Sequence, residues 1–200
     1  MSSGASIGAS VPVKVVSSLP MWLLMAAAMM LPGALPAAQH VATNTFRRGR
    51  SRAVGAFIGT YLLIWIAFGV AAEMLITAVG VAPGGAVFAV VLAAAAVYEL
   101  TTVKRWALNR CHRSWPLPPS GLHSVIGVAR FAWISASGCV ASCWASMLAM
   151  LAAAGTRPLV MVGVTVAMTY ERLTRRPRSG RQRVAVGYSG VAALFLLAAV

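Results

Sequence analysis

The hydrophobic residues of this chain fall in long blocks that short polar connections separate. Each block holds about 20 residues, which is the length an α-helix needs to cross the hydrocarbon core of a bilayer. The pattern predicts six spans, at residues 20–38, 54–79, 85–103, 124–153, 157–171 and 184–200. We therefore expect an all-α fold, a polytopic membrane helix bundle with about six transmembrane helices.

The first 18 residues precede these blocks and have a different composition. They are rich in Ser, Gly and Val and carry Lys14 as their single charge, which favours a flexible N-terminal leader over residues 1–18. No connection between the later blocks is long enough to build a soluble domain. Residues 19–200 are therefore expected to form a single transmembrane helical domain.

Composition and charge support this class and orient the bundle. Hydrophobic residues make up 60% of the chain, charged residues 10%, and the mean hydropathy is +0.81. Most basic residues follow spans one, three and five, namely Arg47, Arg48, Arg50, Arg52, Lys104, Arg105, Arg110, Arg113, Arg172, Arg175, Arg176, Arg178, Arg181 and Arg183. Basic connections face the cytoplasm, so both termini are expected outside, in a multi-pass protein of the inner (plasma) membrane. The net charge of +14 is thus a topology signal that favours the lipid bilayer, and not nucleic acid, as the partner.

Acidic residues are scarce, which makes each of them informative. The chain contains Glu73, Glu99 and Glu171 and no Asp. A carboxylate within a span is unfavourable unless it is paired or faces a polar cavity. Glu171 adjoins Arg172, and Glu99 lies five residues before Lys104, so interfacial ion pairs are expected for both. Glu73 has no basic neighbour in the sequence and is the acid expected to face a cavity or a partner. All three are candidate polar site residues, with Glu73 or Glu99 expected to contribute to function through such a contact.

Two spans carry sulfur at helical spacing. Span one has Met25 and Met29, and span four has Cys139, Cys143 and Met147. The two spans run in opposite directions, so their sulfurs reach similar depths and can meet if the spans are neighbours. Thiolate and thioether ligands select Cu(I), so we predict a buried soft-metal site at these five residues, with copper as the expected metal. The alternative is that they are ordinary packing residues of the core.

A second group of ligand types is expected at the cytoplasmic side. It comprises His40 after span one and Cys111 and His112 after span three. These side chains are candidates to receive a metal ion, or they are unremarkable interfacial residues. The three cysteines of the chain do not indicate a disulfide framework.

Several local motifs resemble those of a known family. They are Trp22-x2-Met25-x3-Met29-Met30-Leu31-Pro32, Tyr98-Glu99-Leu100-Thr101 before Lys104-Arg105 and Cys111, and Cys139-x3-Cys143-Trp144-Ala145-x-Met147. Over most of residues 20–173 the chain resembles the bacterial integral membrane proteins described as predicted metal-binding, domain of unknown function 2182. The resemblance implies metal binding. This chain departs from the family pattern at Ala107 and Ser142, where that family commonly has Cys, and at Glu99, where it has Gln.

Two classes of function remain open after these observations. The first is an integral membrane protein that binds or handles a soft metal. The second is a non-catalytic subunit or assembly factor of a larger membrane complex, because Ala- and Gly-rich spans let helices approach partner subunits closely. An enzyme is less favoured, since the chain has no Ser-His-Asp set, no paired carboxylates in one short motif and no phosphate-binding Gly loop.

Overall fold

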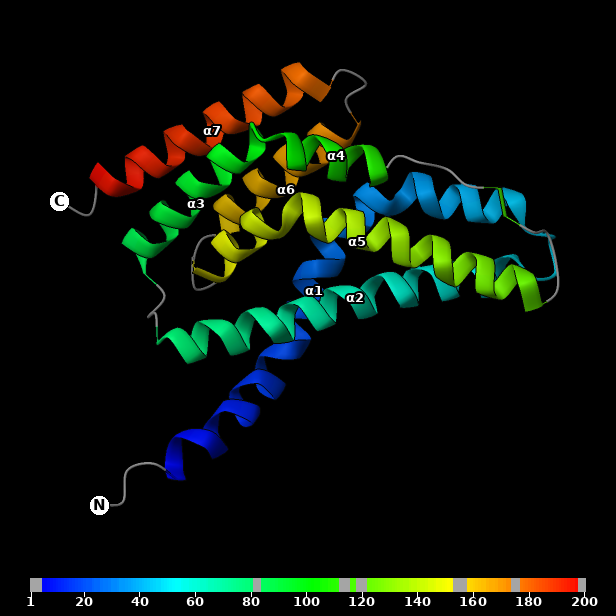
Figure 1. The fold of residues 1–200 in the computed structure, drawn as a ribbon, viewed down its shortest axis with the longest axis horizontal. Coiled ribbons are helices and arrows are strands. Elements are labelled where there is room, and N and C mark those ends of the chain that lie inside the picture. The colour runs from blue at the N-terminus through cyan, green and yellow to red at the C-terminus, as the bar shows by residue number, and fades with distance from the viewer. Residues whose placement is uncertain are drawn as a thin grey trace.

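Helices account for nearly all of the chain that the structure describes. This computed structural model describes residues 5–80, 84–111, 116–117, 122–152, 158–173 and 177–197. The helices in these ranges are α1 (Ala5–Asn44), α2 (Arg50–Val79), α3 (Gly85–Glu99), α4 (Thr102–Cys111), α5 (Leu122–Ala152), α6 (Pro158–Leu173) and α7 (Pro177–Leu197) (Figure 1). The predicted all-α class is confirmed.

The predicted spans overlap α1, α2, α3, α5, α6 and α7, but several ends differ, and α7 begins at Pro177 where residue 184 was expected. Helix α1 begins at Ala5, so most of the segment expected to be a leader has helical backbone. Once a long helix is nucleated, each added residue gains a backbone hydrogen bond, which favours this extension. The connection expected after residue 103 instead contains α4, which begins beyond Thr101. The Thr101 Oγ1 atom accepts a hydrogen bond from the backbone N–H of Lys104 at 3.2 Å, the arrangement of an N-terminal helix cap.

Three of the described helices are long and apolar enough to cross a membrane. They cover Leu19–Asn44, Arg50–Val79 and Ser124–Ala152. Helices α3 and α4 meet at an angle of 76°, and the pair would form a fourth span if it is counted as one broken helix. The number of six spans stays a prediction.

Helix α5 lies at the centre of the fold. It packs against α2, α3 and α4, and in Figure 1 it runs between α2 and the layer of α3 and α7. In its most apolar stretch 61% of the residues are buried, compared with 28% in α1 and 17% in α2. Side chains on the inner face of α5 are therefore the ones most completely shielded from the surroundings.

Helices α1 and α2 approach each other closely where Trp22 packs against Gly69. The Trp22 indole Nε1 donates a hydrogen bond to the backbone carbonyl of Trp65 at 2.9 Å. A Cβ atom on Gly69 would lie 2.1 Å from the same nitrogen, so the indole occupies the space that the missing side chain leaves. Because the two helices run in opposite directions, this contact fixes which turns of α1 and α2 face each other.

Candidate metal centre

The thiol of Cys139 lies where α1, α2 and α5 meet. Its Sγ atom accepts a hydrogen bond from the Tyr61 hydroxyl at 2.8 Å. The same sulfur lies 3.8 Å from the thioether Sδ of Met30, to which it donates. The exposed fractions are 1% for each of these three residues, so this cluster of one thiol, one thioether and one phenol is sealed inside the fold.

The separation of the two sulfurs fits a shared metal ion. Protein metal–sulfur bonds of about 2.3 Å, meeting at an angle near 110°, place their sulfur atoms about 3.8 Å apart. Cys139 and Met30 have this separation already. The two residues can therefore serve as ligands of one ion without a shift of α1 against α5.

Further sulfur atoms surround this pair in the same continuous core. Met29, Cys143 and Met147 are buried there, and Met25 is partly buried and packs against it. The Cys143 Sγ lies 3.4 Å from the Ser142 Oγ. On α5, residues 139, 143 and 147 occupy successive turns of one buried face, as their spacing predicts.

A buried ion pair lies at the bend between α3 and α4. The Lys104 Nζ and the Glu99 Oε1 are 2.7 Å apart, and the exposed fractions of the two side chains are 1% and 2%. The spacing of these residues predicted the pairing, and this prediction is confirmed. Their burial was not expected, because the sequence placed both residues at the membrane interface.

The ion pair belongs to a wider polar group beside α5. Tyr188 of α7 is buried in the same region, close to Glu99, Lys104, Cys143 and the Ser146 side chain. Charged and polar groups therefore lie next to the part of α5 that carries Cys143 and Ser146. In a region of low dielectric such a group exerts a strong field on a bound cation.

Two of the residues predicted for a cytoplasmic metal group, His40 and Cys111, lie beside neighbouring turns of α5. The His40 ring packs against Phe131, with ring centroids 5.6 Å apart, and its Nδ1 lies 3.3 Å from the Asn44 Nδ2. The Cys111 Sγ instead approaches the carbonyl of Ser135 at 3.9 Å. His112 and the side chain of Glu171 lie outside the described residues.

Glu73 is separate from these groups. It is half-buried on α2, and its backbone carbonyl accepts a hydrogen bond from the Thr77 hydroxyl at 2.7 Å. Across the described ranges, no three or more His, Cys, Asp or Glu side chains form a group able to hold a metal ion.

Sequence reasoning missed Met30 and Tyr61 beside Cys139, and Tyr188 in the polar group beside α5. Met30 stands beside the predicted ligand Met29, so the sequence did hold a signal for it. The sequence also held a signal for Tyr61, because a tyrosine in the middle of an apolar span requires a hydrogen-bond partner inside the bundle. Tyr188 gave no such signal, since its position depends on how α7 packs against α3.

Comparison with known proteins agrees with the chemistry of these sulfurs. The profile of the PpoB2 family, described as a copper chaperone, matches residues 19–196. No curated protein and no solved structure matches the chain. The matched region contains every sulfur ligand considered above, and the expectation of copper agrees with the family description. Since the match covers most of its length, this chain belongs to the PpoB2 family of copper chaperones.

Proposed function

We propose that this chain is an integral membrane copper chaperone that holds Cu(I) between α1 and α5. The observation that carries the proposal is the separation of 3.8 Å between the Cys139 Sγ and the Met30 Sδ in a sealed core. Met29 and Met147 supply further thioether ligands, because flexible methionine side chains can turn toward an ion, and the Cys143 thiol is buried in the same core. Met25 lies at the edge of this group.

The charges of this ligand set suit a buried Cu(I) ion. A cysteine must lose its proton to bind metal, and one thiolate neutralises one Cu(I). Thioethers add no charge, so the complex of Cys139, Met30 and Cu(I) is neutral and carries a small desolvation penalty. The Tyr61 hydroxyl donates to the same sulfur and stabilises its thiolate form. Soft ligands also favour Cu(I) over harder divalent ions.

Metal retention by the purified full-length chain tests this function. We expect the protein in detergent, loaded anaerobically with Cu(I), to keep about one ion per chain through dialysis against a weak copper chelator. Zn²⁺ offered in the same way should be lost, because a thioether is a poor ligand for it. Loss of copper together with zinc would overturn the proposal.

The membrane location is part of the same proposal. We propose six spans in the inner membrane with both termini outside, as the alternating basic connections indicate. The surface supports a lipid environment, because large apolar side chains are exposed on several helices, among them Met21, Leu24, Leu63, Leu75, Val90, Trp106 and Trp133. A chaperone must also release its copper to a recipient, so a partner protein belongs to this function, as it would for an assembly factor.

Cysteine accessibility checks the orientation. In a Cys111→Ser background, single cysteines introduced at Arg48 and Arg181 should react with a membrane-impermeant thiol reagent only after the cells are opened. The buried Cys139 and Cys143 should stay unlabelled under both conditions. Labelling of either introduced cysteine in intact cells would show that the orientation is wrong.

A further inference from the structure

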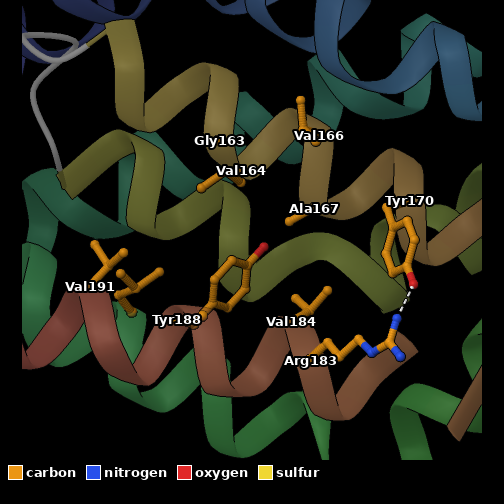
Figure 2. Close-up of a pocket in the computed structure, with 11 residues that line it drawn as sticks. Gly163, Val164, Val166, Ala167, Tyr170, Arg183, Val184, Tyr188 and Val191 are labelled. Atoms are coloured by element: carbon orange, nitrogen blue, oxygen red, sulfur yellow. Dashed lines mark hydrogen bonds between the residues drawn. The ribbon is translucent and has the colours of Figure 1, made fainter. Parts of the chain in front are cut away.

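An apolar pocket lies between α6 and α7. It has a volume of about 500 Å³, within the range of ligand-binding cavities. Helix α6 contributes Gly163, Val164, Val166, Ala167 and Tyr170, and helix α7 contributes Arg183, Val184, Gly187, Tyr188 and Val191, while Leu92 of α3 completes the lining (Figure 2). The walls are thus almost entirely aliphatic, with three polar side chains placed among them.

Two of these polar side chains meet at one end of the pocket. The Arg183 Nη1 donates a hydrogen bond to the Tyr170 hydroxyl at 2.9 Å, which Figure 2 shows as a dashed line. Both residues are exposed, so the remaining donors of the guanidinium are accessible. A guanidinium has five N–H donors arranged in a fork that matches phosphate oxygens. This end therefore suits an anionic phosphate group.

The third polar side chain is Tyr188, which extends from α7 toward α6 (Figure 2). It is 5% exposed, and within the described part of the chain the Ser146 side chain of α5 approaches its hydroxyl without forming a hydrogen bond of normal geometry. Leaving a buried hydroxyl without a partner is unfavourable. A ligand that brings an oxygen acceptor into the pocket would satisfy it.

We infer that this pocket binds a single anionic phospholipid. Its acyl chain fills the aliphatic space, its phosphate contacts Arg183 and Tyr170, and its ester carbonyl accepts a hydrogen bond from Tyr188. Tyr188 lies five positions after Arg183 in the chain, which corresponds to a rise of about 7.5 Å along the helix axis. The phosphate and the ester carbonyl of a phospholipid are a few bonds apart, so one molecule can reach both groups.

The charge of the surroundings favours an anionic headgroup. The chain has 17 basic and three acidic residues, and six arginines lie between residues 172 and 183. Cytoplasmic leaflets carry anionic lipids that attract such basic segments. The inference rests on the proposed membrane location and makes no use of the copper site.

Lipid retention by the purified full-length chain tests this inference. After delipidation in detergent, the protein is offered phosphatidylglycerol or phosphatidylcholine, and bound lipid is counted by native mass spectrometry. We expect one phosphatidylglycerol per chain. Arg183→Gln should weaken its retention by roughly tenfold or more, and Tyr188→Phe by roughly two- to tenfold. Arg130→Gln, at an exposed position of α5, is the matched control and should bind like the wild type.

A variant that fills the pocket with a larger side chain provides a second test of lipid binding. A Cβ atom added at Gly187 meets no described atom within 4 Å, so Gly187→Leu can fill the pocket without a clash and should abolish retention of both lipids. Unchanged binding in Gly187→Leu, equal binding of the two lipids, or displacement by inorganic phosphate would overturn the inference. Copper content is measured in the same samples. Loss of lipid with copper retained, or the reverse, shows which of the two proposals has failed.

Discussion

Replacing Cys139 and Cys143 together by serine should lower the retained Cu(I) by roughly tenfold or more while leaving the helical content unchanged. A serine hydroxyl is a hard ligand that stays protonated at neutral pH, so it supplies neither the softness nor the charge that Cu(I) requires. The fold should tolerate the change, because a serine at position 139 can still accept the hydrogen bond from Tyr61. Copper analysis after anaerobic dialysis and far-ultraviolet circular dichroism measure the two quantities.

Matched variants distinguish the individual ligands. Cys111→Ser changes a half-buried thiol near Ser135 and should leave copper retention unaltered. Met30→Leu should weaken Cu(I) binding more than Met25→Leu, because the Met30 sulfur lies 3.8 Å from the Cys139 Sγ, whereas Met25 is a partly buried residue packed against the core. If the double serine variant keeps as much copper as the wild type, these sulfurs are packing residues and the proposed site is wrong.

The second large effect concerns the buried ion pair. Lys104→Met should lower the free energy of unfolding by about 3–5 kcal/mol, because it leaves the Glu99 carboxylate buried without its countercharge. Thermal unfolding of the purified protein, followed by circular dichroism in one detergent, measures the loss. The double variant Glu99→Gln with Lys104→Met should recover most of it, since neither charge then remains in the interior.

Comparison of the single and double variants separates charge from packing. If the double variant is as unstable as Lys104→Met alone, the lysine acts through its aliphatic stem and not through its charge. Full stability of the single variant would show that Glu99 needs no countercharge at this position. Arg110→Gln is a suitable control, because this exposed cation stacks on Trp106 at the surface of α4 and should have a small effect.

Hydrophobic block length was sufficient to predict the helices, since a span of apolar residues has few alternatives to helix. Local spacing was also sufficient for contacts within one helix or across a short bend, as for Glu99 with Lys104. It did not decide whether Met29 or Met30 would reach Cys139. Adjacent residues point about 100° apart on a helix, so the choice depends on how α1 rotates when it packs.

Contacts between helices that are far apart in the sequence could not be predicted either, because they also depend on how the helices pack. Tyr188 reaches the polar group only because α7 packs against α3, and no local pattern encodes that neighbour. The bend of 76° between α3 and α4 was also missed, because Leu100 and Thr101 contain no Gly or Pro to signal a break. Tertiary packing, and not propensity, set these features.

The contact between the Trp22 indole and Gly69 determines the level at which the ligands of the proposed metal site lie. Met30 lies eight residues after Trp22 on α1, and Tyr61 lies eight residues before Gly69 on α2, so both reach the same level from this one contact. Sliding α1 by a turn would carry Met30 about 5.4 Å away from the Cys139 thiol, and sliding α2 by a turn would carry Tyr61 away from it by the same distance. In the proposed copper site, the alignment of Met30 and Tyr61 with Cys139 therefore depends on the contact between Trp22 and Gly69, about two helical turns away.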